Sequence, residues 1–242
     1  MRLLIWDFDG TLGYRESGAW AGGAWTAALL EVLEAHAPER DVTQEALCPY
    51  TRTGFRWHRP ATHHAPVADA SGGQADAWWA ELEPVFARAY AGVGLPDAEA
   101  WALARRVRST YVDLRRWHRY DDVAPMLARL AAAGWTHVML TNHVPELSAI
   151  VGALSLTDRF ARIFNSARTG YEKPNPRAFE LVLEAFPEAG ACWMVGDSYQ
   201  ADVLGAQAVG LPAVLVRRPH PEARHYAETL PALLAILANG ER

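Results

Sequence analysis

The stretch Leu3-Leu-Ile-Trp-Asp-Phe-Asp-Gly-Thr11 decides how the rest of the chain is interpreted. Its first four residues are all apolar and do not alternate with polar ones, which is typical of a strand buried on both faces of a parallel sheet. Asp7 and Asp9 follow this strand directly, and Gly10 and Thr11 complete the stretch. Because side chains alternate along an extended chain, the two carboxylates would project to the same side. Open parallel sheets bind ligands at the carboxyl ends of their strands, so the sequence predicts that chemistry takes place here.

Four further apolar runs extend the predicted sheet, and helical patterns alternate with them. The predicted strands are Leu3–Trp6, Thr136–Leu140, Ala161–Phe164, Ala191–Val195 and Ala213–Val216. The predicted helices are Asp122–Ala133, Pro176–Phe186 and Tyr199–Val209, with Asp121 and Asn175 as N-caps and Gly134 and Gly210 as stops. Such alternation is the signature of a doubly wound α/β domain with a parallel sheet.

Residues 14 to 118 interrupt this alternation and contain no run that resembles a strand. Helices are predicted near Ala19–His36, Thr43–Arg56, Ala75–Tyr90 and Asp97–Trp117, with an irregular loop over Arg59–Gly73. Seven of the ten tryptophans, at positions 20, 25, 57, 78, 79, 101 and 117, lie in this insert, which favours a compact helical core over a ligand cage. The expected organisation is an α/β core of residues 1–13 and 119–242, with an all-helical domain of residues 14–118 inserted after the first strand.

The composition indicates a globular protein with a substantial core and limits the classes of partner. Half of the 242 residues are hydrophobic, and the net charge of −5 argues against nucleic acid as the main partner. No apolar stretch approaches the ~18 residues of a membrane helix, and the first apolar run ends too early for a signal peptide. Cys48 and Cys192 form no motif, which favours a reducing compartment. We therefore expect a cytoplasmic protein without membrane association, and the sequence leaves its oligomeric state open.

Four predicted strand ends carry side chains suited to chemistry. They are Asp7, Asp9, Gly10 and Thr11, then Thr141 and Asn142, then Lys173, and finally Asp197, Ser198 and Asp202. Lys173 is the single lysine among 23 basic residues. Because arginine presents a broad planar fork and lysine a compact ammonium, a lone lysine suggests a site that requires the compact ion.

In these motifs and in their order, the chain resembles subfamily I of the haloacid dehalogenase (HAD) superfamily of hydrolases. The four motifs of that superfamily are matched by Asp7–Thr11, Thr141, Lys173 and Asp197–Asp202. The resemblance implies a Rossmann-like core, and the helical insert looks like the C1-type cap of the family. It also implies a phosphatase that hydrolyses a small phosphorylated metabolite through an aspartyl-phosphate intermediate.

The resemblance makes Mg²⁺ the expected cofactor. Asp7 would be both nucleophile and metal ligand, and Asp9 would be the general acid and base, with its backbone carbonyl on the metal. Asp197 would complete the protein's metal ligands. Electrostatics agrees, because converging carboxylates repel one another and a hard divalent cation with oxygen ligands relieves the repulsion.

The remaining motif residues are expected to hold the phosphoryl group. From the resemblance, Thr141 and the amide of Asn142 would bind phosphoryl oxygens, and Lys173 would neutralise the nucleophile and the transferring group. Asp202 would orient Lys173 or a metal-bound water. The residues expected to support the site are Gly10, Thr11 and Ser198.

Other chemistries of the superfamily fit less well or stay open. The dehalogenase members lack an aspartate at the position of Asp9 and use no metal, so carbon–halogen cleavage is disfavoured. The phosphonate-cleaving members need a lysine from the cap, and this insert has none. A phosphomutase on the same core stays an alternative, as does a weakly active interaction module that uses the Trp-rich insert as a binding face.

Three clusters in or beside the insert suggest weaker hypotheses. His58, His63 and His64 could bind a transition metal, although a solvated loop is preferred. A basic stretch could form a nucleic-acid stripe, although a charged helix face is preferred, and it comprises Arg105, Arg106, Arg108, Arg115, Arg116 and Arg119. The arginines that could meet an anionic substrate are Arg15, Arg52, Arg56 and Arg59.

Overall fold

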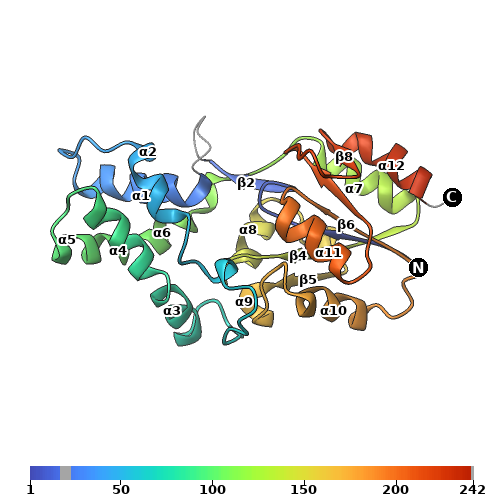
Figure 1. Ribbon diagram of the computed structural model, residues 1–242, viewed down its shortest axis with the longest axis horizontal. Helices are drawn as coiled ribbons and strands as arrows, with labels where there is room; N and C mark the ends of the chain where they lie inside the picture. The colour runs from blue at the N-terminus through green and yellow to red at the C-terminus, as the bar shows by residue number, and fades with distance from the viewer. Residues whose placement is uncertain (17–22, 241–242) are drawn as a thin grey trace. The chain divides into compact units, whose positions relative to one another are not determined.

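The computed structural model describes residues 1–16 and 23–240 (Figure 1). The chain divides into two compact units. The first comprises Met1–Tyr14, Pro60–Pro66 and Arg119–Arg242, and the second comprises Arg15–Arg59 and Val67–His118. Residues 60–66, which the sequence analysis places in the insert, therefore group with the first unit.

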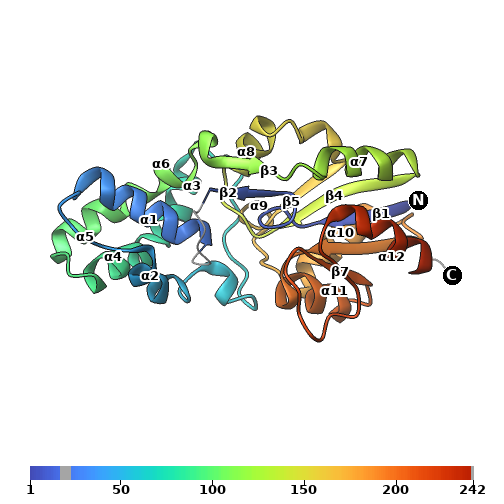
Figure 2. The same ribbon diagram turned by 90° about the horizontal axis from the view of Figure 1, so that it is seen from above.

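A six-stranded sheet forms the centre of the first unit, and every neighbouring pair of its strands is parallel. Its order is β5 (Arg162–Asn165), β4 (Trp135–Thr141), β1 (Arg2–Trp6), β6 (Ala191–Gly196), β7 (Ala213–Val216) and β8 (Tyr226–Ala227). The five predicted strands and the α/β class are confirmed, whereas the sixth strand, of two residues, is too short to show in the sequence. β1 lies between β4 and β6 with Ile5 opposite Val138 and Met194, and Figure 2 shows β1 beside β4. The strand that carries Asp7 at its end is thus central.

Helices cover both faces of this sheet. Figure 1 shows α7 (Val123–Ala132) and α12 (Leu233–Gly240) above the strands and α10 (Pro176–Ala185) below them. The buried side chains of α10 pack on those of β1 and β4, with Phe179 and Val182 beside Leu3 and Ile5. This burial on both faces explains the unbroken apolar runs that identify the strands in the sequence.

Of two predicted N-caps, Asn175 is confirmed and Asp121 is not. Asn175 caps α10 as predicted, since its Oδ1 accepts a hydrogen bond from the Arg177 amide at 2.9 Å, and Pro176 occupies the first helical position. The prediction that Asp121 caps α7 is wrong. Asp122 holds the N-cap position of α7 without a side-chain cap, because its carboxylate bonds Arg217 and the amide of Leu230 instead.

The predicted helix over Tyr199–Val209 begins as a π-helix, η5 (Tyr199–Leu204), and continues as α11 (Gly205–Ala208). Single turns of π-helix are frequent at functional sites. Asp202 lies in this turn and is buried, so the irregular turn carries one of the predicted site carboxylates. Shorter elements of the first unit are α8 (Leu147–Ala153), η4 (Thr157–Arg159), α9 (Ser166–Thr169) and η6 (Leu230–Ala232).

The second unit is helical, but its helices are shorter than predicted. They are α1 (Gly23–His36), α2 (Gln44–Leu47), η1 (Cys48–Thr51), η2 (Arg56–His58), α3 (Gly73–Ala80), α4 (Glu83–Gly92), α5 (Asp97–Ala104), α6 (Val107–Tyr111) and η3 (Leu114–Arg116). Residues 19–22 of the first predicted helix lie outside the described residues. Proline breaks two of the others, because Pro49 stands in η1 and Pro84 opens α4. Nothing in the sequence explains the break between α5 and α6.

Aromatic side chains form the interior of this second unit. Trp25 stacks on Tyr111 with ring centroids 3.8 Å apart and lies 5.7 Å from Phe86. Trp78 and Trp79 are buried, whereas Trp101 is 39% exposed. The expected helical core is therefore built largely from the tryptophans, and Trp20 lies outside the described residues.

Two short strands that the sequence does not predict lie where the chain first leaves the first unit and where it finally returns to it. They are β2 (Gly13–Arg15) and β3 (Trp117–Arg119), which pair as a separate two-stranded sheet. Among the helices of the described residues, none combines the length and apolar character needed to cross a membrane. Cys48 and Cys192 are both free, and burial raises the pKa of the Cys192 thiol to about 12, as expected of an inert thiol.

Candidate active site

Three carboxylates meet at the carboxyl ends of neighbouring strands. Asp7 follows β1, Asp197 follows β6, and Asp202 lies one turn further on in η5. Each offers an oxygen that lies within 4.8 Å of one from both others. The amide of Asp7 donates to the carbonyl of Val195 at 2.9 Å, which ties the two strand ends together. The parallel sheet therefore brings residues nearly 200 positions apart into one cluster.

Lys173 lies against this cluster and is 2% exposed. Its Nζ donates to Asp7 Oδ1 at 2.7 Å and to Asp202 Oδ1 at 2.5 Å. Burial alone would lower the pKa of this ammonium, but the carboxylates of Asp202 and Asp7 outweigh burial and raise it above the ordinary value. The lysine is consequently a permanent cation that holds one oxygen of each aspartate.

The side chain of Asn142 holds the loop that carries Lys173. Its Nδ2 donates to the carbonyl of Lys173 at 2.9 Å, and its Oδ1 accepts from the amide of Lys173 at 2.7 Å. The peptide bond between Lys173 and Pro174 is cis. Asn142 therefore positions the lysine through its side chain, which leaves its backbone amide for the predicted contact with a phosphoryl group.

The cluster carries more negative than positive charge. Burial, followed by the charges of Asp7 and Asp202, raises the pKa of Asp197 to about 8, and the guanidinium of Arg218 partly opposes this. Burial also raises the pKa of Asp202, to about 6, against the opposing effect of Lys173. Arg218 reaches Asp197 Oδ2 at 3.2 Å but is 75% exposed, so solvent screens the pair. A site with surplus buried carboxylate and oxygen donors only is the environment that Mg²⁺ prefers.

Two glycines allow the backbone to approach these carboxylates. A Cβ on Gly10, whose φ is +83°, would lie 2.3 Å from Asp197 Oδ2. A Cβ on Gly196 would lie 2.1 Å from Asp202 Oδ2. Both distances are far shorter than van der Waals contact, so any side chain would displace a carboxylate. Gly10 is among the predicted supporting residues, whereas Gly196 is not and could have been found from its place directly before Asp197.

Of the hydroxyl groups of the predicted site, that of Thr141 is without a partner among the described residues, whereas those of Ser198 and Thr11 contact other groups of the protein. Thr141 Oγ1 is buried at the end of β4 and has no hydrogen-bond partner within the described part of the chain. A buried hydroxyl without a partner is uncommon, and it fits a group that bonds a ligand. Ser198, by contrast, caps η5, because its Oγ accepts from the amide of Ala201 at 3.1 Å. Thr11 Oγ1 lies 3.4 Å from Asp7 Oδ2, a long contact.

Asp9 stands apart from the three gathered carboxylates. It is partly exposed on the tight turn that follows β1, and it forms an isolated bridge with Gly13. The group whose side-chain oxygens gather is Asp7, Asp197 and Asp202, whereas the sequence predicts metal ligands at Asp7, Asp9 and Asp197. The two sets are compatible, since the expected contribution of Asp9 is its backbone carbonyl.

Besides Gly196, four residues beside the cluster are not predicted from the sequence: His143, Arg218, Tyr120 and Arg217. His143 is buried with its ring 5.4 Å from that of Phe8, and burial lowers its pKa to about 4 despite the nearby charge of Asp7. It is therefore a neutral imidazole at physiological pH. Its only signal in the sequence is its place directly after Asn142.

The weaker candidates are mostly engaged elsewhere. His64 is buried, unlike His58 and His63, which are exposed as expected of a solvated loop, and its amide donates to the carbonyl of Gly170 at 2.9 Å. His63 stacks on Tyr171 with centroids 4.5 Å apart. Arg15 and Arg56 are buried in the second unit and paired with Glu31 and Glu81, both at 2.7 Å. The arginines of the basic stretch that pair with acidic residues are Arg105, Arg108, Arg115 and Arg116, as expected of a charged surface.

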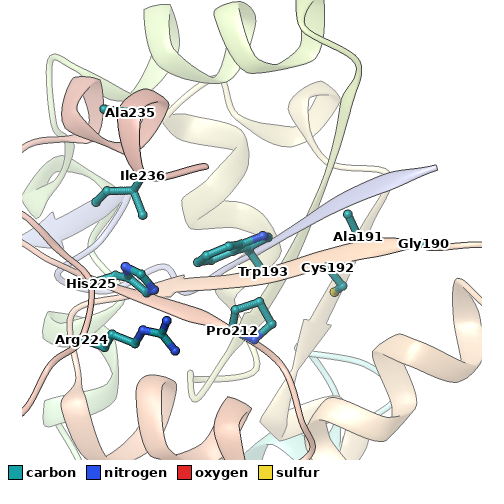
Figure 3. Close-up of a pocket in the computed structure, with 9 residues that line it drawn as sticks. All are labelled: Gly190, Ala191, Cys192, Trp193, Pro212, Arg224, His225, Ala235 and Ile236. Atoms are coloured by element: carbon teal, nitrogen blue, oxygen red, sulfur yellow. The ribbon is translucent and has the colours of Figure 1, made fainter. Parts of the chain in front are cut away.

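A cavity of about 650 Å³ lies at the opposite, amino-terminal end of β6 (Figure 3). Its lining includes Cys192, Trp193, Pro212, Arg224 and His225. Among residues 1–16 and 23–240, its lining includes no acidic side chain, no lysine and none of the predicted site residues. The chemistry predicted from the sequence therefore belongs to the carboxyl end of the strand and not to this cavity.

Comparison with known proteins bears on the site. A model of the haloacid dehalogenase-like hydrolases matches residues 1–210. The phosphoserine phosphatase of Thermus thermophilus is 37% identical over 232 residues, covering 90% of this chain and 89% of that protein. Haloacid dehalogenase-like hydrolase domain-containing protein 3 of Homo sapiens is 29% identical, covering 90% of this chain and 83% of that protein. A phosphoglycolate phosphatase of Mesorhizobium japonicum is 36% identical over 115 residues, which cover 47% of this chain and 50% of that protein.

Solved structures share the fold over nearly the whole chain. The HAD hydrolase YfnB of Bacillus subtilis, bound to magnesium, superposes with a TM-score of 0.67 at 21% identity, covering 98% of each chain. A dehalogenase superposes with a TM-score of 0.68 at 20% identity, covering 98% of this chain and 97% of the other. At these identities the likeness speaks for the fold alone, so the chemistry has to be argued from the residues.

Proposed function

The chain belongs to the haloacid dehalogenase-like hydrolase family, and on that premise we propose that it is a Mg²⁺-dependent phosphatase acting on a small phosphate monoester. The observation that carries the proposal is the buried group of Asp7, Asp202 and Lys173, with Asp197 beside it, at the carboxyl ends of β1 and β6. Phosphatases among the relatives support the class of reaction. The dehalogenases among the structural neighbours do not weigh against it, because at 20 to 24% identity they speak for the fold alone, and the family resemblance implies that dehalogenase members lack an aspartate at the position of Asp9.

Asp7 is the proposed nucleophile. Lys173 and Thr11 contact different oxygens of its carboxylate, at 2.7 and 3.4 Å, so the orientation of the group is set before substrate binds. Attack by an Asp7 oxygen on phosphorus forms an aspartyl-phosphate while the ester oxygen leaves. Lys173 stays protonated throughout, because its pKa is raised, and it offsets the charge on the phosphoryl oxygens.

Asp9 is the proposed general acid and base. In the first step its proton goes to the leaving oxygen, and in the second step it takes a proton from the water that hydrolyses the aspartyl-phosphate. Asp9 is partly exposed, unlike Asp7, so it can exchange protons with water between turnovers. The unpartnered hydroxyl of Thr141 and the backbone amide of Asn142 would bind the phosphoryl oxygens.

Asp7, Asp197 and the backbone carbonyl of Asp9 would hold Mg²⁺. When bound, the ion supplies positive charge that offsets the repulsion among the carboxylates and polarises the phosphoryl group. Asp202 would keep Lys173 in place through its 2.5 Å contact, and the Ser198 amide, 2.9 Å from Asp202 Oδ2, fixes that carboxylate in turn. We further propose that the helical unit of residues 15–59 and 67–118 corresponds to the cap of the family.

The test is release of phosphate by the purified protein from a panel of phosphorylated metabolites, with and without Mg²⁺. Phosphoserine and phosphoglycolate belong in the panel because relatives carry these names. Asp7→Asn should lower the rate by at least about 10⁴-fold, because the nucleophile is lost. Asp158→Asn, an exposed aspartate of the first unit, is the matched control and should leave the rate unchanged.

Mg²⁺-dependent turnover by the Asp7→Asn variant, or no release of phosphate from any compound by the wild-type protein, would contradict the proposal. Conversion of one labelled sugar phosphate into its isomer without free phosphate would instead indicate a phosphomutase.

A further inference from the structure

We propose that Arg217 is a positioning residue that holds the turn carrying Asp9 in place for proton transfer to the leaving group. The inference rests on the proposed function, in which Asp9 is the general acid. Nothing in the motifs points to Arg217, which follows β7 and is 206 positions from the residue it contacts in the turn.

Backbone hydrogen bonds within residues 8–13 shape the turn that follows β1. The amides of Thr11, Leu12 and Gly13 all donate to the carbonyl of Phe8, at 3.2, 2.9 and 3.0 Å. The amide of Gly10 donates back to the carbonyl of Gly13 at 2.8 Å. These bonds close residues 8–13 into a tight loop with Asp9 and Gly10 at its tip. Because they are internal to the loop, they fix its shape without fixing its position.

Two hydrogen bonds join the outer leg of the loop to other segments, in addition to the pairing of β2, which begins at Gly13, with β3. The amide of Tyr120 donates to the carbonyl of Leu12 at 3.3 Å, which is a long bond. Arg217 Nε donates to the carbonyl of Thr11 at 2.9 Å, which is the shorter of the two. A charged donor on a carbonyl is also the stronger type of bond. Arg217 therefore provides the firmer attachment of the turn.

Arg217 is itself fixed on three sides. Its Nη2 donates to Asp122 Oδ1 at 2.7 Å, and its guanidinium lies 3.6 Å from the ring centroid of Tyr120. Its side chain is 13% exposed, so water competes little for these contacts. The other oxygen of Asp122 accepts from the amide of Leu230 at 2.9 Å, which anchors the carboxylate in turn. The Asp122 carboxylate and the Tyr120 ring thus hold the guanidinium in place, and its Nε transmits that position to the turn through the carbonyl of Thr11.

The backbone of Arg217 indicates that its side chain is needed at this position. Its φ is +63°, in the left-handed region that residues with a Cβ seldom adopt. Within the described residues, Ser155 is the one other non-glycine residue with a positive φ. Glycine would occupy this conformation without strain, so an arginine here is unfavourable unless its side chain contributes something.

Tyr120 connects the group to Asp9 electrostatically. Burial raises the pKa of the Tyr120 hydroxyl, and the charge of Asp9 raises it further, whereas Arg217 lowers it. Asp9 and Arg217 therefore both act electrostatically on Tyr120, and Arg217 lies over its ring. Loss of Arg217 would let the turn shift, and a proton donor displaced by even a fraction of an ångström transfers its proton poorly.

The closing experiment uses two aryl phosphates of similar shape, p-nitrophenyl phosphate and phenyl phosphate, with Mg²⁺. Nitrophenolate is stable and leaves without a proton, whereas phenolate leaves poorly unless an acid protonates it. Since a general acid contributes about 10²–10⁴-fold, Arg217→Gly should lower kcat/KM about 30-fold for phenyl phosphate and less than about threefold for p-nitrophenyl phosphate. Arg217→Lys, which keeps the charge without the planar fork, should show a smaller loss with the same selectivity.

Controls separate positioning from stability. Ser155→Gly relieves the other positive φ at an exposed position and should change neither rate, and thermal unfolding should show that all variants are folded. In an Asp9→Asn background, Arg217→Gly should cause no further selective loss, because both changes act on one proton transfer. Equal losses on the two substrates, or a selective loss that persists without Asp9, would overturn the inference alone. No Mg²⁺-dependent hydrolysis by the wild-type protein would overturn the proposed function together with it.

Discussion

Deeply buried cations occur in both units of the molecule, and two of them, Arg15 and Lys173, are balanced differently. Arg15 in the second unit pairs with a single carboxylate, that of Glu31, at 2.7 and 3.1 Å, and donates to the carbonyls of Thr110 and Tyr111. Lys173 in the first unit faces Asp7 and Asp202, with Asp197 close by. Arg15 is thus matched charge for charge, whereas the group around Lys173 has surplus negative charge and an unpartnered hydroxyl beside it. The difference teaches that a buried cation indicates a ligand site only where its surroundings are left incomplete.

Replacing Lys173 should have the largest effect and tests the incomplete site. Lys173→Met should lower kcat/KM for a phosphate ester about 10³-fold, because a buried charge that stabilises the transferring group is lost. Lys173→Arg should lose nearly as much, since a planar fork does not fit a position that is 2% exposed between two carboxylates. Steady-state kinetics with Mg²⁺ measures both. Activity of Lys173→Arg near that of the wild type would show that only the charge matters and would weaken the contrast with Arg15.

Replacing Arg15 tests the matched pair and should affect stability alone. Arg15→Met should lower the free energy of unfolding by about 3 kcal/mol, because Glu31 loses its bidentate partner and keeps the longer 3.8 Å contact with Arg116, and the carbonyls of Thr110 and Tyr111 lose a charged donor. Arg15→Lys, which keeps the charge but loses the bidentate fork, should cost less. Urea denaturation gives the change, and kcat per folded molecule should stay within about threefold of wild type. A large loss of activity in folded Arg15→Met would remove the distinction between the two cations.

The free energy of unfolding, measured against pH without metal, should show the surplus of carboxylates around Lys173. The pKa of Asp197 is raised to about 8 in the folded protein, whereas that of an unfolded aspartate is about 4. Between these values the folded state binds a proton that the unfolded state lacks, so stability falls as pH rises. From about pH 6.5 to about pH 8 in EDTA, the free energy of unfolding should fall by about 2 kcal/mol.

Mg²⁺ should reverse this loss, and more strongly at the higher pH, because the ion binds the ionised carboxylates. Asp197→Asn removes the titrating group and should flatten the profile. A wild-type profile without slope in EDTA would mean that the carboxylates around Lys173 are not in excess.

Asn142 offers the smallest expected effect and tests how Lys173 is held. Asn142→Ala removes the two hydrogen bonds to the backbone of Lys173 but leaves its ammonium and both aspartates intact. The expected loss in kcat/KM is about tenfold, the size of one or two hydrogen bonds. Asn142→Asp keeps the acceptor for the amide of Lys173 but loses the donor to its carbonyl and adds a negative charge. Its kcat/KM should therefore fall by more than the loss of one hydrogen bond alone would cause. An unchanged rate in Asn142→Ala would show that the aspartates alone position the lysine.

Much of the fold could be predicted because its signals are local. The apolar runs of the five longer strands follow directly from burial on both faces, and the family resemblance drawn from four short motifs is confirmed by the match over residues 1–210. β8 could not be predicted, since two residues carry no periodicity. The division of the helical region into short pieces could be predicted only at Pro49 and Pro84, where the missing amide interrupts the helix.

The candidate site divides in the same way. The chemistry proposed for Asp7, Asp9, Thr141, Lys173 and Asp197 rests on their residue types and on the family resemblance of their motifs, whereas the places of Gly196, His143 and Arg218 beside the cluster depend on packing. The N-cap of α7 shows why packing cannot be predicted from neighbouring residues. Asp121 and Asp122 are equally good N-cap candidates in the sequence, and they differ only because Asp122 contacts Arg217, which follows β7.

Sequence alone thus determined the five longer strands and the motifs that carry the proposed reaction, because each strand or motif is recognised from neighbours a few positions away. Only the tertiary structure decided which carboxylates share Lys173, that Arg15 is already satisfied, and that Arg217 reaches the turn of Asp9. Those contacts join residues 16 to 206 positions apart, and such distances are set by how strands and helices pack. Local sequence patterns extend over a few residues and so contain no information about them.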